Sequence, residues 1–524
     1  MSNDAARGRY SASRREVIKA GAAILSAHLA PHRRLAAMAN PALVSEANLR
    51  VDPTPRFDLS PNLFMQFMEP LGVTDSSVEA AWDHRAKRWR PDVIEATRQL
   101  GPPLIRWGGI LSAYYRWREG IGPRATRKPY VNLCWGGVET HQVGTHEFVD
   151  FCRQVGAEPF YCVNFESEGA EHWRRGPDGE DRSAGPDEAA AWVDYCNNPD
   201  NRERKANGAD KPFNLRLWQI GNETSYSDQH FGLDKAAERT AAFAVAMRKA
   251  DPTIALIGWG DSGWAPRMLE VAGEHLQYIA FHHHFDSGLP DSPLHGNEWR
   301  KDPDRTWEHL MHAHRSLDAK LREMREQVEG RGVSLAMTEG HFALGGRNRC
   351  EVLSTWAAGV ANARMLNVQA RHGDLLKIAT LADFCGTRWQ VNAIMIPVPG
   401  GRSFLMPVAR VMALFRHMGE RALDVEAAPD GLDVTASATG RRVYLHVVNT
   451  RRTRDVQASL GIAGRRILGG RLFTLSADPE FEIIGHQDGV LEPVESRMAD
   501  DATITFKAAS VTAVELDLDE PRQT

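Results

Sequence analysis

The chain has 524 residues, of which 42% are hydrophobic and 25% charged, a composition typical of globular proteins that excludes disorder, collagen and a coiled-coil rod. Its 63 basic and 68 acidic side chains leave a net charge of -5, which is too balanced for a nucleic-acid binder and predicts a neutral or polar partner. The six cysteines include no C-x-x-C pair, so neither a zinc site nor a disulfide framework is indicated, and most are expected to be buried thiols. The length favours two domains, one of them large, and leaves a homo-oligomer open.

Residues 1–39 resemble a twin-arginine export signal. Arg14 and Arg15 precede the weakly apolar run 20–30, and Ala37-Met38-Ala39 offers an A-x-A cleavage site. The run is too short for a membrane-spanning helix, which needs ~20 apolar residues, and no later segment supplies one. We therefore expect export to the periplasm or the exterior; an amphipathic N-terminal helix is the alternative.

Between residues 60 and 420, short β-prone runs alternate with helical patterns, as in parallel βα units. Eight such units predict a closed (β/α)8 barrel, with a doubly wound open sheet as the alternative. The predicted strands are Leu63–Glu69, Leu104–Gly109, Pro159–Phe165, Leu215–Glu223, Ile254–Gly260, Tyr278–Phe285, Ser334–Gly340 and Lys377–Phe384. The clearest predicted helices are His146–Val155, Pro186–Cys196, Leu233–Ala250, Thr306–Val328, Glu351–Ala370 and Met406–Met418.

Residues 421–524 have a different pattern, with short alternating strands separated by Gly, Asp and Pro turns, which predicts a β-sandwich. Residues 48–57, ahead of the barrel, are expected to add a strand to it. The predicted sandwich strands are Leu432–Ala436, Arg442–Val448, Arg471–Leu475, Ala502–Phe506 and Thr512–Leu516.

Two predicted barrel strands, the fourth and the seventh, end in the glutamates Glu223 and Glu339. A charged side chain that ends an apolar strand is costly to desolvate unless it is paired or functional, and taken singly each fits a structural salt bridge equally well. However, the strands of a barrel end at one rim, where active sites lie. Two carboxylates that converge there suit glycoside hydrolysis, in which one protonates the leaving oxygen and the other attacks the sugar carbon or activates a water.

Five motifs follow one another in a characteristic order: FMEPLG at 67–72, IRWGG at 105–109, WREGIGP at 117–123, WVDYCN at 192–197 and WQIGNE at 218–223. With them, the chain from Leu63 to Leu516 resembles glycoside hydrolase family 51, chiefly α-L-arabinofuranosidases, within a clan of retaining barrel enzymes. The resemblance implies a hydrolase that needs no cofactor and acts on a carbohydrate.

The resemblance also implies roles for individual residues. Glu223 would be the general acid/base and Glu339 the nucleophile, while Arg106 would orient the nucleophile. Asn222 would bond the sugar's 2-hydroxyl and Glu69 another hydroxyl. The full set expected to bind substrate is Glu69, Arg106, Trp107, Asn164, Asn222, His282, His284 and Asp383.

The sequence departs from the family pattern around the sugar. Ile110 follows the paired glycines where the family has an asparagine, and His284 and Phe285 stand where a tyrosine is usual. Asp383 replaces a glutamine, and His341 follows Gly340 where the family commonly has Trp-Asn. These changes predict a retained mechanism with altered sugar specificity. The alternatives are a β-xylosidase, β-glucuronidase or endoglucanase of the same clan, or a catalytically silent carbohydrate-binding protein.

Three further patterns have competing interpretations. Gly258 to Gly263 matches G-x-G-x-x-G after a strand, but Pro266 interrupts the helix that a dinucleotide site requires. His282 and His284 lie on the same side of a strand, as metal ligands do, yet no further zinc ligands are evident, and a sugar contact is preferred. Tryptophans at or just after strand ends fit either the core or sugar stacking: Trp107, Trp135, Trp259, Trp264 and Trp389.

Overall fold

The computed structural model describes residues 49–226, 230–343, 350–499 and 502–520. The export signal expected over residues 1–39 lies outside these ranges. Within them, we find no helix with the length and apolar character that a bilayer crossing requires.

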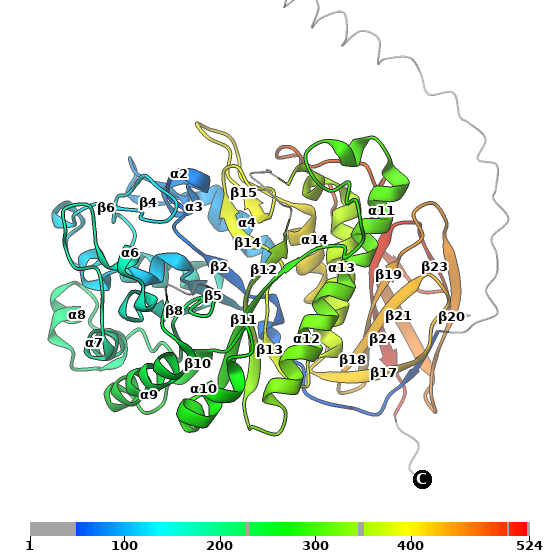
Figure 1. Cartoon of the computed structure of the whole chain (residues 1–524). Helices are drawn as coiled ribbons and strands as arrows, with labels where there is room; N and C mark the ends of the chain where they lie inside the picture. The colour runs from blue at the N-terminus through cyan, green and yellow to red at the C-terminus, as the bar shows by residue number, and fades with distance from the viewer. Residues whose placement is uncertain (1–48, 227–229, 344–349, 500–501, 521–524) are drawn as a thin grey trace, which may run out of the picture. The chain divides into compact units, whose positions relative to one another are not determined.

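Eight parallel strands form one sheet in the order β13-β12-β11-β10-β9-β8-β5-β2 (Figure 1). The backbone N–H of Met65 donates to Ala379, and that of Ala379 donates to Asn62, each at 3.0 Å, so the last strand also meets the first. The predicted (β/α)8 barrel is thus confirmed. Its strands are β2 (Gln66–Met68), β5 (Leu104–Trp107), β8 (Glu158–Val163), β9 (Leu217–Ile220), β10 (Ala255–Trp259), β11 (Tyr278–Phe285), β12 (Ser334–Phe342) and β13 (Leu376–Ile378).

The barrel strands divide their side chains between two cores. Alternate residues, such as Phe67, Leu104 and Ile257, face inward and fill the barrel with one apolar cluster. Their neighbours, such as Ile105 and Leu256, belong to a larger cluster that also contains the buried faces of the helices. This alternation follows from the two-residue period of a strand. It decides which motif residues can reach the barrel interior.

Helices surround the barrel, and two predicted helices are divided. The stretch Thr306–Val328 breaks at Ala313, and Glu351–Ala370 breaks at Thr355, whose hydroxyl accepts from Ala358 N as a helix cap. The helices are α2 (Gly72–Asp75), α3 (Ser77–Ala81), α4 (Pro91–Leu100), α5 (Thr145–Val155), α6 (Glu171–Arg174), α7 (Pro186–Asn197), α8 (Arg202–Ala206), α9 (Leu233–Ala250), α10 (Ala265–Ala272), α11 (Pro303–His312), α12 (His314–Val328), α13 (Trp356–Arg371) and α14 (Pro407–Phe415).

The eighth predicted strand, Lys377–Phe384, is also divided. Its first part is barrel strand β13, which ends where Ala379 turns to bond the start of β2. Its second part is β14 (Asp383–Gly386), which pairs with β15 (Asn392–Met395) in a separate sheet completed by β16 (Phe404–Leu405). Asp383 therefore lies on this small sheet rather than on a barrel strand.

Two short hairpins precede the small sheet in the chain: β3 (Trp82–Asp83) with β4 (Arg88–Trp89), and β6 (Tyr130–Val131) with β7 (Val138–Glu139).

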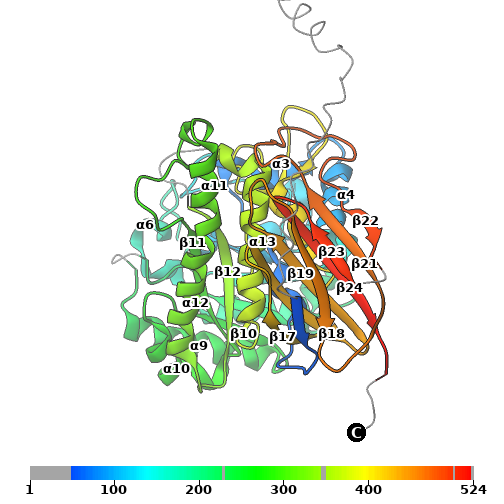
Figure 2. The ribbon, with the colours of Figure 1, turned by 90° about the vertical axis from the view of Figure 1, so that its right-hand side faces the viewer.

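The C-terminal strands form a nine-stranded sheet in the order β22-β21-β24-β19-β18-β17-β1-β20-β23 (Figure 2). Residues from both ends of this order, such as Leu472 and Phe506, share one apolar cluster, as in the predicted sandwich. The first described strand, β1, pairs with β17 and β20. The strands are β1 (Leu49–Asp52), β17 (Arg421–Ala427), β18 (Leu432–Thr439), β19 (Arg442–Asn449), β20 (Val456–Ile462), β21 (Ile467–Ser476), β22 (Val494–Arg497), β23 (Thr503–Phe506) and β24 (Ser510–Leu518).

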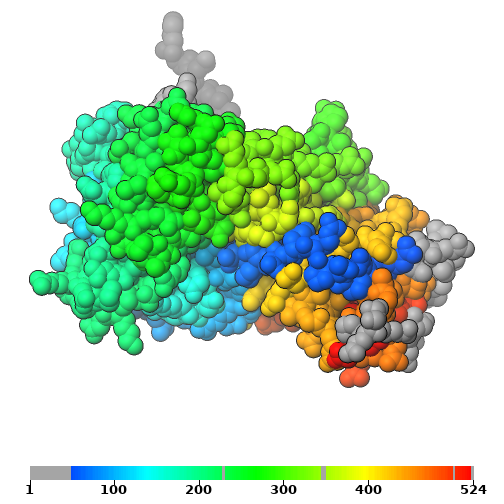
Figure 3. All heavy atoms as spheres, turned by 90° about the horizontal axis from the view of Figure 1, so that it is seen from below, coloured from blue at the N-terminus to red at the C-terminus, as the bar shows by residue number. Residues whose placement is uncertain are grey.

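The chain after β1 runs along the boundary between barrel and sandwich, where Figure 3 shows it in blue. Arg56 N donates to Ala422 O at 2.9 Å, and Leu59 N donates to Glu420 O at 2.8 Å. Asp433 of β18 adds a buried link, because it pairs with Arg364 and Arg371 of α13. The two sheets are therefore connected by both backbone bonds and a charge network.

Candidate active site

The two strand-end glutamates come together with His282. One carboxylate oxygen of Glu223, one of Glu339 and a ring nitrogen of His282 all lie within 4.8 Å of one another. Glu339 is part of β12 and His282 part of β11, whereas Glu223 follows the end of β9. Their side chains remain partly open, with 23% of Glu223 and 11% of Glu339 exposed. The expected pair of carboxylates thus faces one space at the carboxyl ends of the barrel strands.

Arg106 ties this centre together from inside the barrel. Its side chain is fully buried, and its Nη1 donates to Glu339 Oε1 while its Nη2 donates to Asn222 Oδ1, both at 2.6 Å. Burial alone would lower the pKa of Arg106, but the neighbouring Glu339 carboxylate raises this pKa above its ordinary value. The guanidinium therefore stays charged and orients both partners. Asn222 Nδ2 is buried without a protein partner, so this N–H is free to bond a ligand.

His282 is a neutral bridge between the glutamates. Its Nδ1 lies 2.9 Å from Glu223 Oε1 and 3.7 Å from Glu339 Oε2, and its Nε2 lies 3.0 Å from the Thr338 hydroxyl. Burial lowers the pKa of His282 to about 3. The ring therefore carries no charge at neutral pH, and it can donate from Nδ1 while Nε2 accepts from the hydroxyl.

Glu223 lies on a strained turn, and its surroundings favour the protonated form of its carboxyl group. Its φ is +56°, a left-handed value that non-glycine residues seldom adopt outside turns and functional sites. Burial raises the pKa of Glu223, and this outweighs the opposing effects of His284 and Arg106. A carboxyl group that keeps its proton to higher pH is suited to act as a general acid.

Glu168 holds that turn through hydrogen bonds, a role that no sequence pattern indicated. Asn222 N donates to one carboxylate oxygen of Glu168 at 3.0 Å, and the Thr224 hydroxyl bonds the other. Burial raises the pKa of Glu168 to about 8. At neutral pH the residue therefore holds the turn without adding a second negative charge beside Glu223.

Glu69 lies just after β2 and is held by two donors. Its Oε1 accepts from Ile110 N at 3.0 Å and from Trp135 Nε1 at 3.1 Å. Burial, with the nearby Glu339 charge, raises the pKa of Glu69 well above its ordinary value. Gly109 makes room for this carboxylate, because a Cβ there would lie 2.2 Å from Glu69 Cδ.

Asp383 and two histidines form a further polar cluster near Glu339. His341 Nε2 is 3.6 Å from Asp383 Oδ1, and the His341 and His284 rings are 4.5 Å apart. Burial raises the pKa of Asp383 well above its ordinary value, with a further contribution from Glu339. Asp383 Oδ1 has no hydrogen-bond donor from the protein. This cluster therefore offers polar groups that protein bonds do not fully use.

Two residues expected to bind substrate do not face this space. Trp107 follows Arg106 on β5, so it points out of the barrel, where it is 2% exposed and packs edge-on against Phe148. Asn164 uses its whole amide within the protein: Nδ2 donates to the carbonyls of Tyr115 and Arg182, and Oδ1 accepts from two backbone N–H groups. We correct both to structural roles.

The other tryptophans at strand ends differ in their exposure. Trp135 and Trp389 are partly exposed beside Glu69 and meet edge to face at 5.4 Å. Trp259 is buried in the barrel interior, and Trp264 packs partly buried against both cores.

Tyr226, which sequence reasoning missed, lies near both glutamates and is 45% exposed. No spacing rule pointed to it, because it lies on the turn and not on a strand.

The remaining sequence patterns have structural explanations. In the turn from Gly258 to Gly263, Asp261 accepts from Ser262 N at 2.6 Å, so a carboxylate occupies the place where a dinucleotide site would need free N–H groups. A triad of possible metal-binding atoms does exist, but it joins His282 to the two glutamates and leaves out His284. Five of the six cysteines are buried, as expected.

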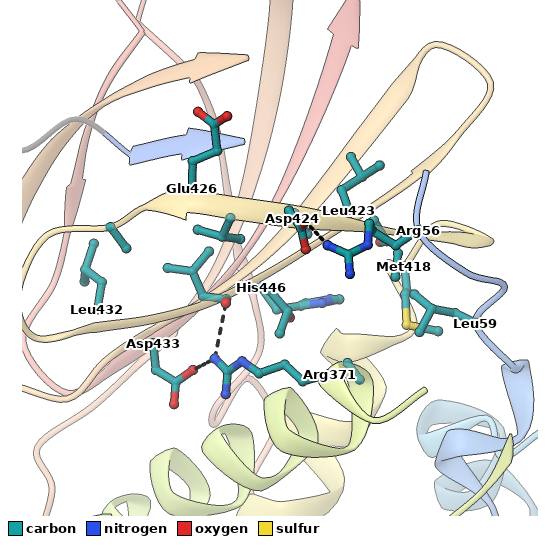
Figure 4. Close-up of a pocket in the computed structure, with 18 of the residues that line it drawn as sticks. Arg56, Leu59, Arg371, Met418, Leu423, Asp424, Glu426, Leu432, Asp433 and His446 are labelled. Atoms are coloured by element: carbon teal, nitrogen blue, oxygen red, sulfur yellow. Dashed lines mark hydrogen bonds and ion pairs between the residues drawn. The ribbon is translucent and has the colours of Figure 1, made fainter. Parts of the chain in front are cut away.

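A cavity of about 720 Å3 lies elsewhere, between α13 and strands β17 and β18 (Figure 4). Five of its charged residues pair with one another: Arg56 with Asp424, and Arg371 and Arg364 with Asp433. None of the residues expected to act on substrate lines it. We therefore assign it to the junction of the two domains.

Comparisons with known proteins agree with this geometry. Residues 96–290 match the family model of the α-L-arabinofuranosidase 1 domain. A probable α-L-arabinofuranosidase C of Aspergillus terreus is 32% identical over 232 residues, 42% of each chain. An exo-α-(1->6)-L-arabinofuranosidase of Bifidobacterium longum is 31% identical over 274 residues, 48% of this chain and 49% of that one. These alignments span less than half the length of either relative.

Substitution of Gly109 by alanine should disable Glu69 without unfolding the protein. The added methyl group would collide with the Glu69 carboxylate, and a displacement of about 1 Å in a positioning group costs roughly 100-fold in kcat/KM. Gly179→Ala is the matched control, since Gly179 also has a positive φ (+79°) but no atom within 4 Å of its Cβ position. Steady-state kinetics and thermal unfolding would be measured for both variants. Equal kcat/KM in both would contradict a substrate-binding role for Glu69.

The fold extends the likeness beyond the aligned region. The structure of the thermostable GH51 α-L-arabinofuranosidase from Thermotoga petrophila superposes with a TM-score of 0.74 at 23% identity, covering 90% of this chain and all of that one. The resemblance indicated by the motifs is confirmed: the chain is similar to family 51 α-L-arabinofuranosidases, in sequence over its central region and in fold over nine tenths of its length.

Proposed function

We propose that this protein is a retaining glycoside hydrolase of the α-L-arabinofuranosidase type that releases a terminal sugar from the non-reducing end of its substrate. The observation that carries the proposal is the proximity of the two carboxylates: one oxygen of Glu223 and one of Glu339 lie within 4.8 Å of each other and of a ring nitrogen of His282. Retaining glycosidases hold their carboxyl groups about 5 to 5.5 Å apart, whereas inverting ones need about 6.5 to 9.5 Å to admit a water. The spacing therefore favours direct attack by a carboxylate.

The arrangement supports a double displacement. Glu339, oriented by Arg106, would attack the anomeric carbon while Glu223 gives its proton to the departing glycosidic oxygen. Glu223, now ionised, would then take a proton from a water that attacks the same carbon and releases Glu339. Asn222 Nδ2, which has no protein partner, would bond a sugar hydroxyl next to the reacting carbon. His282, neutral and within 2.9 Å of Glu223, would keep the acid in place through both steps.

The charges around the centre favour an uncharged sugar. Glu69, Glu223, Glu339 and Asp383 contribute four carboxyl groups, and the guanidinium of Arg106 already pairs with Glu339. An anionic sugar therefore could not take Arg106 as its partner, and burial lowers the pKa of His282 to about 3 and that of His284 to about 4, so neither ring offers a positive charge at neutral pH. A uronide-cleaving activity is therefore the least favoured of the clan alternatives. The changed residues around the sugar, among them His284 and Asp383, still leave room for a neutral glycoside other than arabinofuranoside.

Product stereochemistry and a substrate panel test the proposal. We expect the unmodified enzyme to cleave neutral pentosides, with arabinofuranosides among them, and proton NMR to show a first product of the same anomeric form as the substrate. Glu339→Ala should abolish hydrolysis, and added azide should restore part of the turnover with inverted product, because azide replaces the missing nucleophile. A first product of opposite anomeric form would refute the role of Glu339 as nucleophile.

Substitution of Glu223 by alanine should affect substrates according to their leaving groups. Poor leaving groups need protonation and should lose about 100- to 10,000-fold in rate, whereas a dinitrophenyl glycoside should lose far less in its first step. The unmodified enzyme should lose kcat/KM as pH rises through the raised pKa of Glu223, since the protonated acid is the active form. That alkaline decline should vanish in the variant with the dinitrophenyl substrate. Equal losses on both substrates would contradict the acid role.

We also propose that residues 1–39 direct export through a twin-arginine pathway, which the pair Arg14 and Arg15 before a weakly apolar run supports. Fused to a reporter that is active only after export in the folded state, the segment should confer activity outside the cytoplasm. Arg14→Lys together with Arg15→Lys should abolish it. Arg33→Lys with Arg34→Lys is the matched control, and export that persists equally in both pairs would refute the assignment.

A further inference from the structure

Tyr226 is an aromatic residue beside the proposed acid that the mechanism above does not use. It follows Glu223 by three residues on the same turn, and 45% of it is exposed although the Glu223 and Glu339 carboxylates are near enough to influence its hydroxyl. A single exposed aromatic ring is common on protein surfaces, so what distinguishes this ring is its position and how it is held. Because Tyr226 lies next to the proposed acid, the part of a substrate nearest to its ring would be the part that the acid protonates.

The Tyr226 ring is held by its hydroxyl group. The hydroxyl donates to Asp261 Oδ2 at 2.6 Å, and Asp261 Oδ1 in turn accepts from Lys320 Nζ at 2.5 Å. Asp261 is 2% exposed, and the Lys320 side chain 14%. A buried ion pair therefore anchors one end of the tyrosine, which leaves the ring little freedom to rotate away.

A second set of bonds holds the turn that carries Tyr226. Trp259 Nε1 donates to the Ser225 hydroxyl at 2.8 Å, and the Ser225 and Ser262 hydroxyls lie 3.2 Å apart. These partners belong to the glycine-rich segment Gly258 to Gly263, which resembled a dinucleotide motif in sequence. In this fold, the segment forms hydrogen bonds to the turn that carries Glu223 and Tyr226.

The two aromatic neighbours of Tyr226 in the described residues meet it at a steep angle. Trp259 and His282 are the aromatic neighbours of Tyr226 within the described residues, with centroids 5.3 and 6.4 Å away. Both stand at 81° to it, so neither lies flat over the phenol. A partly exposed aromatic ring that is held in one orientation is a surface on which the apolar face of a sugar ring can stack.

We propose that Tyr226 is the platform for the leaving-group sugar, with Asp261 and Lys320 as positioning residues that fix its orientation. The inference rests on the proposed function, in which Glu223 protonates the glycosidic oxygen, so that the leaving group must lie on the Glu223 side of the broken bond. The ligand is accordingly the sugar ring of an oligosaccharide to which the terminal sugar is attached. Tyr226 would thus select substrates by their leaving group.

Two substrates with the same terminal sugar isolate this contact. One is the methyl arabinofuranoside, whose leaving group has no ring, and the other is a xylooligosaccharide that carries the same arabinofuranosyl group. Both leaving groups are weakly acidic alcohols and need Glu223 alike. Tyr226→Ala should lower kcat/KM about tenfold on the oligosaccharide, mostly through KM, and less than threefold on the methyl glycoside. Tyr226→Phe keeps the ring face and should lose less on the oligosaccharide than the alanine variant.

Lys320 variants test the positioning role. Lys320→Met should raise KM for the oligosaccharide severalfold while kcat on the methyl glycoside stays within twofold, and Lys320→Arg should restore the oligosaccharide KM. Equal losses of Tyr226→Ala on the two substrates would overturn the platform role. The proposed function fails in a distinguishable way, because then the unmodified enzyme would cleave neither substrate nor any other glycoside of the panel.

Discussion

The buried guanidinium of Arg106 is the interaction on which the candidate site depends. A charge with no exposed surface must be paired and hydrogen-bonded, and Arg106 meets this need with Glu339 on one strand and Asn222 on another, both at 2.6 Å. The three groups come from β5, β12 and the turn after β9. One buried cation thereby fixes Glu339, the proposed nucleophile, relative to the turn that carries Glu223, the proposed acid.

The barrel and its two glutamates were accessible from sequence because they depend on local pattern. Strand runs, their spacing and the charged strand ends all follow from rules that act within a few residues. The same rules left one ambiguity at each strand, namely which of two adjacent residues faces inward. Arg106 and Trp107 illustrate it: both belong to one motif, but the alternation of the strand buries one at the centre and sends the other beneath the helices. Thr355 has the residue type of a helix N-cap, but the long apolar pattern around it suggested one continuous helix.

Other features could not be predicted, because partners far apart in the sequence create them. Glu168 reaches the acid's turn from the loop after β8, and Asp261 reaches Tyr226 from the loop after β10. The eighth strand breaks because Ala379 bonds Asn62, more than three hundred residues earlier in the chain, and this break moves Asp383 onto a separate small sheet. Such contacts leave no periodic trace in the sequence. They concentrate on loops, where this fold builds its site.

The carboxyl groups of the site can lie so close together because they do not all carry charge. Burial raises the pKa of Glu69, Glu223 and Asp383, while Arg106 compensates the charge of Glu339 directly. One guanidinium can neutralise one carboxylate, so the others gain most by keeping their protons. In its protonated form Glu223 would serve as the proposed acid, and Glu69 and Asp383, when protonated, can donate as well as accept hydrogen bonds toward sugar hydroxyls. The buried guanidinium of Arg106 therefore sets Glu339, the proposed nucleophile, apart from three carboxyl groups whose pKa is raised, as the proposed hydrolysis of an uncharged glycoside requires.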